Sequence, residues 1–224
     1  MQFPPQSADN QERRTENEEL KPGAMRVLIT AGPTREPLDP VRFIGNRSSG
    51  RTGLALAAAA RRRGHPVKLL LGPGVAAPAA GGDDFERFET TAELESRLGQ
   101  SMAECDLLLM AAAVADWRPA EVAAEKRPRR AGRWSVDLEP TPDLLAGVAR
   151  RRRPDQRLVA FALEPRAALA EHGRAKLHRK GVEAIWVNPL ESAEAESTEG
   201  LWIPAQGQAE PWGPGSKASA AAWI

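Results

Sequence analysis

The segment MRVLITAG (residues 25–32) decides the fold, because a short apolar run that ends in glycine is typical of a buried strand. After a polar stretch, residues 49–64 are rich in alanine and predict a helix that Ser49 caps and that ends in arginines before Gly64. The next apolar run, PVKLLLGP (residues 66–73), predicts a second strand. This order of strand, helix and strand indicates a right-handed crossover within a parallel sheet.

The alternation of strands and helices continues along the chain. Strands are predicted at residues 85–90 and 105–116, with a helix between them. A helix follows at residues 141–152, with Thr141 as its cap and Pro142 at its first position. The remaining predicted elements are a strand at 157–164, a helix at 166–181, a strand at 183–188, a weaker strand at 200–204 and a terminal helix at 216–224. We therefore expect an α/β fold, a Rossmann-like three-layer sandwich with a mostly parallel central sheet.

The charges of the chain nearly cancel. It has 31 basic and 30 acidic residues among 224, which gives a net charge of +1 at pH 7. Such a chain lacks the basic footprint of a nucleic-acid-binding module or of a protein that binds anionic membranes, so neither nucleic acid nor membrane is expected as a partner. The arginines at residues 61–63 and 150–153 lie at predicted helix ends, where they complement the helix dipole in solvent.

The domain organisation follows from length and local composition. At 224 residues, one domain with a tail is the natural expectation. Residues 1–24 are rich in Glu, Gln, Asn and Pro, and we expect them to form a disordered extension before a single domain at residues 25–224. Since neither a signal peptide nor an apolar run of about 18 residues is found, we expect a cytoplasmic protein. The single Cys105 precedes an apolar run and is expected to be buried rather than nucleophilic.

The unusual polar segments follow predicted strands. The segment TAGPTREPLDPVRFIGNRSSG (residues 30–50) comes after the first strand, and AAAVADWRPAEVAAEKRPRR (residues 111–130) comes at the end of the fourth. FALEP and VNPL end two later strands. In a parallel sheet, ligands bind beyond the carboxyl ends of the strands. The sequence therefore predicts one site at this edge of the sheet.

Ser48, Ser49 and Gly50 lead into the first predicted helix. The free amide groups and the dipole of a helix N-terminus favour an anion such as phosphate, and small residues allow it to approach closely. The segment matches neither the GK[ST] phosphate loop nor the dinucleotide-binding glycine fingerprint. An ordinary capped helix is the alternative interpretation.

Three other groups of residues suit a nucleotide, although each leaves an alternative. The small residues of AAAVAD (residues 111–116) could lie beside a base, and Asp116 offers a carboxylate to a hydroxyl group or to bound Mg²⁺. Lys126 heads a basic loop that could cover phosphates or could simply be solvated. Lys176 and Lys180, four residues apart on one predicted helix, could reach a phosphate or only keep the helix soluble.

Six segments occur in the order found in one family of enzymes. They are ITAGPTREPLDPVRFIGNRSSGRTG (residues 29–53), AAAVADWRP (111–119), EKRPRR (125–130), PTPDLLAG (140–147), FALE (161–164) and AKLHRKG (175–181). The chain in this region resembles phosphopantothenoylcysteine synthetase, also called phosphopantothenate–cysteine ligase, of the CTP-dependent bacterial type. In that family the ligase often follows a flavin-dependent decarboxylase. No decarboxylase segment precedes the ligase region here, so a stand-alone ligase without flavin is expected.

The resemblance implies a reaction of coenzyme A biosynthesis in two steps. The carboxylate of 4′-phosphopantothenate attacks CTP to give an acyl-cytidylate and pyrophosphate, and the amine of L-cysteine then displaces CMP. Mg²⁺ is expected to arrive with CTP, without ligands fixed by the protein alone. A homodimer and a separate phosphopantothenoylcysteine decarboxylase are the implied protein partners. The rival hypothesis is a nucleotide- or dinucleotide-binding Rossmann-like oxidoreductase, which the missing glycine fingerprint disfavours.

The resemblance also implies roles for individual residues. Asn46 matches the asparagine that handles the acyl-cytidylate in the second step, and Arg42 matches an arginine of the same catalytic site. Lys126 matches the lysine of a flap that binds CTP, and Ala112 matches a strand end where a bulky residue would be harmful. The positions that match CTP contacts are Asp116, Lys126, Pro142, Asp143, Leu144, Leu145, Phe161, Lys176 and Lys180.

Overall fold

The computed structural model describes residues 21–78, 84–129, 132–193 and 195–224. Most of the expected disordered extension, residues 1–20, lies outside the described residues. Among the described residues, no helix is long and apolar enough to span a membrane.

An eight-stranded sheet forms the centre of the molecule, in the order β12-β11-β10-β9-β6-β1-β4-β5. Six of these strands pair in parallel, namely β10, β9, β6, β1, β4 and β5. Strands β11 and β12 extend the sheet next to β10 and run antiparallel to their neighbours. The strands are β1 (Val27–Ala31), β4 (Val67–Leu71), β5 (Asp84–Arg87), β6 (Leu107–Met110), β9 (Arg157–Glu164), β10 (Ala184–Pro189), β11 (Ser197–Pro204) and β12 (Glu210–Ser216). The predicted fold class, a Rossmann-like sandwich around a mostly parallel sheet, is confirmed.

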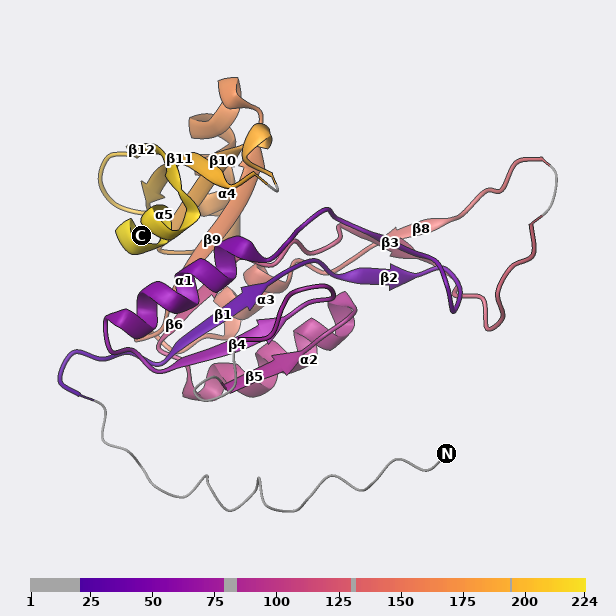
Figure 1. The fold of residues 1–224 in the computed structure, drawn as a ribbon, viewed down its shortest axis with the longest axis horizontal. Helices are drawn as coiled ribbons and strands as arrows, with labels where there is room; N and C mark the ends of the chain where they lie inside the picture. Colours follow the sequence, from indigo (N-terminus) through magenta and orange to yellow (C-terminus); the bar gives the residue numbers. More distant parts are fainter. Residues whose placement is uncertain (1–20, 79–83, 130–131, 194) are drawn as a thin grey trace, which may run out of the picture.

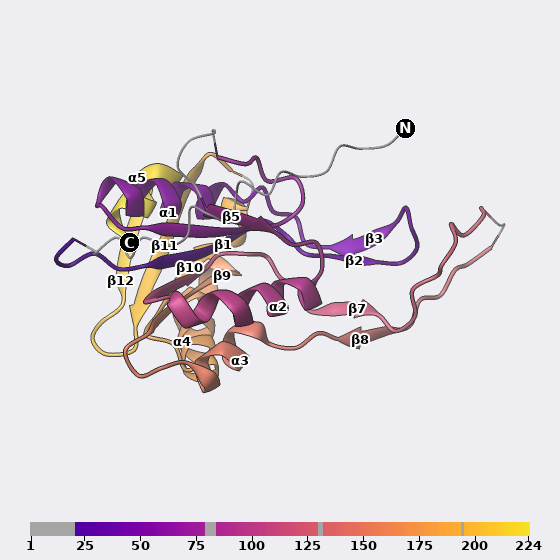
Figure 2. The same ribbon diagram turned by 90° about the horizontal axis from the view of Figure 1, so that it is seen from below.

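Helices cover both faces of the sheet, as Figure 2 shows: α1 and α5 lie on one face, and α2, α3 and α4 lie on the other. The α-helices are α1 (Arg51–Arg62), α2 (Thr91–Ser101), α3 (Leu144–Arg151), α4 (Leu169–Lys180) and α5 (Lys217–Trp223). Short 3-10 helices lie at η3 (Met102–Glu104), η4 (Arg166–Ala168) and η5 (Leu190–Ser192).

The core has two layers because the side chains of each strand alternate between the faces of the sheet. In β1, Val27 and Ile29 pack with residues of α1, such as Leu56, on one face. Leu28 points to the other face and packs with Leu94 of α2. A central strand buried on both sides is a continuous apolar run, which is why MRVLITAG could be recognised as a strand from the sequence.

A second structural feature, an arm made of two small hairpins, projects from the sheet (Figure 1). One hairpin pairs β2 (Arg35–Pro37) with β3 (Phe43–Gly45), and the other pairs β7 (Trp117–Pro119) with β8 (Leu138–Pro140). Strands β2 and β7 are in contact, so the two hairpins lie side by side. Sequence analysis did not predict these strands, which have three residues each.

Several predicted boundaries are wrong. Ser49 does not cap α1; the N-cap is Gly50, which has φ of 70° and no side chain to cap with. Helix α3 begins at Leu144 and is capped by Asp143, whose carboxylate accepts from the amide of Ala146, so Thr141 and Pro142 precede the helix. The fourth predicted strand ends at Met110 in β6, and the chain beyond it forms the loop that leads to the arm.

Candidate active site

A cavity of about 620 Å³ opens beyond the carboxyl ends of β6, β9 and β10. This volume lies in the range of about 300–1,000 Å³ that small-molecule sites usually have. Its walls come from stretches that are far apart in the sequence, namely residues 46–53, 110–116, 141–145 and 160–163, with Lys176, Arg179, Lys180, Ile185, Asn188, Ser192, Ala193, Thr198 and Lys217. The structure therefore brings most of the predicted site residues together.

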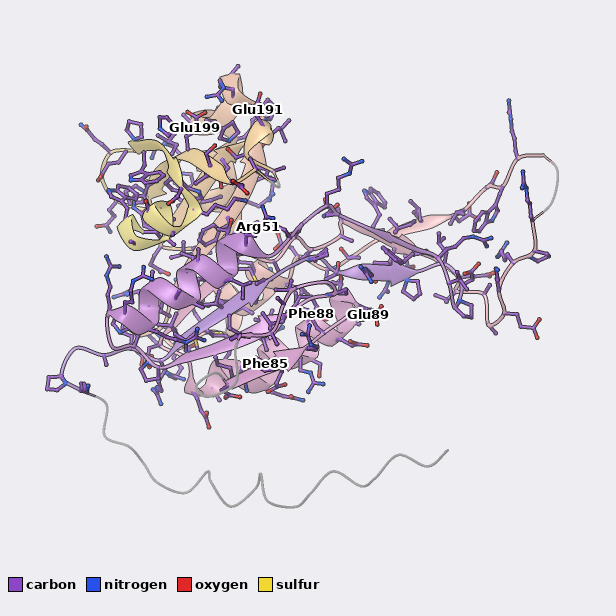
Figure 3. The ribbon with its side chains drawn as sticks, in the orientation of Figure 1. Arg51, Phe85, Phe88, Glu89, Glu191 and Glu199 are labelled. Carbon is purple, nitrogen blue, oxygen red and sulfur yellow. The ribbon has the colours of Figure 1, made fainter. Side chains whose placement is uncertain are left out.

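The predicted anion loop, Ser48, Ser49 and Gly50, forms one wall of this cavity. The positive φ of Gly50 turns the chain into α1, and a Cβ atom there would lie 2.6 Å from a methyl group of Val75. Arg51, the first residue of α1 (Figure 3), also lines the cavity. The N-terminus of α1 and a cation face the same space, an arrangement that suits an anion.

Asn46 links this wall to the small-residue segment that Ala112 and Val114 belong to. Its Nδ2 donates a hydrogen bond of 2.8 Å to the carbonyl oxygen of Val114. The amide of Ala112 donates to Thr30 Oγ1 at 3.0 Å. An amide nitrogen carries two hydrogens, so Asn46 can hold Val114 with one and donate to a ligand with the other. Asn46, Ala112 and Asp116 all line the cavity.

Lys180 and Asp143 meet at the opposite wall. Lys180 Nζ lies 2.8 Å and 2.9 Å from the two carboxylate oxygens of Asp143. Burial raises the pKa of Asp143, but the ion pair with Lys180 and the amide of Ala146 outweigh this effect and lower it overall. Pro142, Leu144 and Leu145, whose positions match CTP contacts in the family, also line the cavity here.

Lys176 is held by a buried carboxylate. Its Nζ lies 2.5 Å from Glu164 Oε1, and His172 Nδ1 lies 2.8 Å from Glu164 Oε2. Burial raises the pKa of Glu164, and the bonds from Lys176 and His172 lower it more. Lys176 lines the cavity together with Phe161, which lies on the neighbouring strand β9.

Arg42 and Lys126 are not among the described residues that line the cavity. Both belong to the arm, where Arg42 Nη1 lies 2.7 Å from Asp39 Oδ2. Lys126 is exposed on the loop between β7 and β8. The geometry of one chain therefore separates these two predicted catalytic residues from the other site residues.

Some cavity-lining residues escaped the sequence analysis. They include Arg47, Thr52, Arg179, Asn188, Thr198 and Lys217. Asn188 lies in the VNPL segment, which was singled out as a strand end, so the position was available as a signal. Thr198 and Lys217 lie on β11 and α5, where the sequence pattern is weak.

The structure also places the single thiol and the acidic side chains of the cavity. Cys105 is buried, as predicted, and burial raises the pKa of its thiol to about 11. Among the described residues, no group of three or more His, Cys, Asp or Glu side chains is arranged to hold a metal ion. Among the described residues that line the cavity, Asp116 and Asp143 carry carboxylates.

Fold and cavity define the class: a Rossmann-like α/β protein with a cation-lined site at the carboxyl edge of its parallel strands. The chain belongs to the family described as DNA/pantothenate metabolism flavoprotein C-terminal domain, whose model matches residues 23–224. This match confirms the family that the six sequence segments resemble.

The relatives agree with this assignment. The chain is 40% identical over 207 residues to the coenzyme A biosynthesis bifunctional protein CoaBC of Mycolicibacterium smegmatis, covering 86% of this chain and 50% of that protein. It is also 40% identical over 170 residues to a cysteine/cysteine sulfinic acid decarboxylase from an unknown prokaryotic organism, covering 76% and 47%. The chain thus spans about half the length of these curated relatives. The crystal structure of the C-terminal domain of CoaBC matches with a TM-score of 0.74 and 30% identity, over 88% of this chain and 90% of that domain.

Proposed function

We propose that this protein is a ligase of coenzyme A biosynthesis that joins 4′-phosphopantothenate to L-cysteine through an acyl-cytidylate formed from CTP. One observation carries the proposal: five of the six segments that resemble this ligase family, all except EKRPRR, contribute residues to one cavity. Asn46, Asp116, Phe161 and Lys176 come from four separate parts of the chain and share its walls. The match to the C-terminal domain of CoaBC supports the same assignment.

In the first step, a carboxylate oxygen of 4′-phosphopantothenate bonds to the α-phosphorus of CTP, and the bond to the bridging oxygen breaks to release pyrophosphate. The negative charge of the triphosphate has to be neutralised in the cavity. Lys176, Arg179 and Lys180 lie on one helix, and Arg51 lies across from them at the start of α1. Positioning by these cations would align the reacting groups without a protein nucleophile.

In the second step, the amine nitrogen of cysteine bonds to the acyl carbon, loses a proton, and displaces CMP as the leaving group. Negative charge gathers on the acyl oxygen during the attack. Asn46 is uncharged and carries a second amide hydrogen beyond the one bonded to Val114, so it can donate to that oxygen. The small side chain of Ala112 leaves space beside the adjacent wall of the cavity.

Mg²⁺ fits the cavity as a companion of CTP. This ion binds through one or two carboxylates together with substrate phosphates, keeps several waters, and needs no preformed protein cage. Asp116 is the carboxylate that would hold it, since Asp143 is occupied with Lys180. When bound, the ion would neutralise phosphate charge. No flavin is required by the proposed reaction, and a separate decarboxylase would consume the product.

Arg42 and Lys126 belong to this proposal through the arm. Both positions match family residues that act on the nucleotide or the intermediate, and both lie on the projecting hairpins. We include a homodimer in the proposal, as the family resemblance implies. The decarboxylase named among the relatives is matched over 47% of its length, and its activity is not transferred to this chain.

Protection from heat tests the site without requiring turnover. A ligand at about 100 times its Kd stabilises a protein by about 2.7 kcal/mol, which raises Tm by roughly 5–10 °C for a domain of this size. CTP with Mg²⁺ should give this rise. A rise with NADPH instead of CTP would favour the oxidoreductase, and a rise with oligonucleotides alone would favour a nucleic-acid-binding module.

A further inference from the structure

Asp39 is a buried carboxylate on an exposed arm. Its side chain is 0% exposed, whereas Val41 and Phe43, which follow it closely, are 59% and 49% exposed. A buried charge is costly unless several donors satisfy it. The donors around Asp39 therefore show what the residue holds in place.

The two oxygens of Asp39 have different partners. Oδ1 accepts from the backbone amides of Val41 and Arg42, both at 2.8 Å, and so closes the turn on which it lies. Oδ2 accepts from Arg42 Nη1 at 2.7 Å and from the backbone amide of Arg127 at 3.3 Å. One oxygen thus folds the local turn, and the other reaches a loop 88 residues further along the chain.

Further contacts support the link between the same two segments. Arg42 Nη1 also donates to the carbonyl oxygen of Arg127 at 3.1 Å. The amide of Ala123 donates to the carbonyl oxygen of Leu38 at 3.0 Å. The guanidinium groups of Arg42 and Arg127 lie 5.8 Å and 5.3 Å from the ring centre of Trp134. Both backbone polar groups of Arg127 are therefore bonded to the turn at residues 38–42.

We propose that Asp39 is a positioning residue that fixes Lys126, because Lys126 directly precedes the restrained Arg127. This inference rests on the proposed function, in which Lys126 contacts the nucleotide. The inference connects Arg42 and Lys126, to which the family resemblance gave separate roles. Arg42 bonds both the carboxylate of Asp39 and the loop that carries Lys126. Residues 120–127 are then held against the β2–β3 hairpin, and the position of Lys126 depends on that hairpin.

Asp39→Asn separates the two roles of the carboxylate. The remaining oxygen can still accept from Val41 and Arg42, and asparagine is well suited to such turns. The new amide group cannot accept from Arg127. We expect the amide of Arg127 to exchange hydrogen about tenfold faster, and the KM for CTP to rise about tenfold with kcat within threefold, as loss of one charge-assisted bond predicts. Glu125→Gln is the matched control: it also removes one negative charge, from the loop that carries Lys126, and both quantities should stay within twofold.

The outcomes divide cleanly. Unchanged exchange at Arg127 in Asp39→Asn overturns the inference, and so does faster exchange with an unchanged KM for CTP. If the wild type shows no turnover with CTP, the proposed function fails, while hydrogen exchange still decides whether Asp39 holds the loop.

If Asp39→Asn does not fold, Trp134→Leu replaces it, since Trp134 is 46% exposed and lies beneath both guanidinium groups. Trp134→Leu should likewise speed hydrogen exchange at the amide of Arg127 and raise the KM for CTP. A variant that changes neither quantity overturns the inference.

Discussion

Lys180 and Asp143 form a two-point ion pair in the cavity wall, with Nζ 2.8 Å and 2.9 Å from the two carboxylate oxygens. The same carboxylate caps α3 through a bond of 3.1 Å from the amide of Ala146. Asp143 therefore ties the start of α3 to the last turn of α4. Both side chains are partly exposed, so the ion pair itself contributes only about 0–1 kcal/mol to stability.

Two substitutions of Asp143 should separate the cap from the ion pair. Asparagine keeps an oxygen acceptor for the amide of Ala146, whereas alanine removes it. We expect Asp143→Ala to cost about 1 kcal/mol, equivalent to a fall in Tm of roughly 2–4 °C, and Asp143→Asn to cost clearly less. Thermal denaturation at pH 7 measures both. Equal losses in the two variants would show that the cap contributes nothing.

The Glu164 cluster predicts a dependence of stability on pH. The pKa of Glu164 is lowered overall, because Lys176 and His172 outweigh the effect of burial. A lowered carboxyl pKa adds stability that is fully present above the unfolded value of about 4.3 and is lost as the pH falls through the lower folded value. Glu164→Gln should therefore cost about 1–3 kcal/mol at pH 7, and the difference from wild type should shrink below about pH 4.

Urea denaturation between pH 2.5 and 7 would measure this difference, with pH values chosen at about half-unit steps around the carboxyl range. Glu199→Gln is the control, because Glu199 pairs with Arg166 at the surface at 2.7 Å. That variant should lose much less stability than Glu164→Gln at pH 7, because its ion pair is exposed to solvent. A Glu164→Gln deficit that persists unchanged at the lowest pH would contradict the ionic explanation.

We expect Gly53→Ala to lower the stability of the protein, although Gly53 lies inside a helix. A Cβ atom there would lie 2.5 Å from the Cβ of Ala31 in β1, so α1 would have to move off the sheet. Gly53→Ala should cost about 1–3 kcal/mol. Gly99, within α2, has nothing within 4 Å of such a Cβ, and Gly99→Ala should stabilise the protein by about 0.5–1 kcal/mol. Opposite signs of the two changes in Tm are the expected result.

Asn46→Asp tests the second step of the proposed reaction. The new carboxylate cannot donate to the acyl oxygen when ionised, and it faces the carbonyl of Val114, which Asn46 bonds at 2.8 Å. We expect pyrophosphate to be released once per site, while formation of the cysteine amide falls about 100-fold. Mass spectrometry of the quenched reaction should show accumulated acyl-cytidylate. Loss of pyrophosphate release without an intermediate would place Asn46 in the first step or in folding, and the rise of Tm with CTP distinguishes those two cases.

The parallel part of the sheet could be predicted from the sequence because buried strands and crossover helices leave distinct patterns. The run at β1 and the alanine-rich α1 are examples. Strand β12 was missed because EPWGPGS contains two prolines and two glycines, residues that argue against a strand. The short arm strands leave too little periodicity to detect, and the Gly50 cap depends on a backbone conformation rather than on a capping side chain.

The site was predictable to the extent that topology gathers the loops after parallel strands. The partners of its charged groups were not predictable from the sequence. Lys176 pairs with Glu164 and Lys180 with Asp143 across different elements, and no sequence spacing indicates such pairs. For the same reason, the resemblance placed Arg42 in the site, but it could not show that Arg42 is bonded to Asp39 on the arm.

Product analysis tests the central claim most directly. The protein is incubated with 4′-phosphopantothenate, L-cysteine, Mg²⁺ and CTP, and the nucleotide and phosphate products are quantified together with the amide. The account predicts phosphopantothenoylcysteine, CMP and pyrophosphate in equal amounts, with none formed when 4′-phosphopantothenate is omitted. Amide formed with CDP and orthophosphate would contradict the acyl-cytidylate route, and no amide from a folded protein whose Tm rises with CTP would contradict the ligase assignment itself.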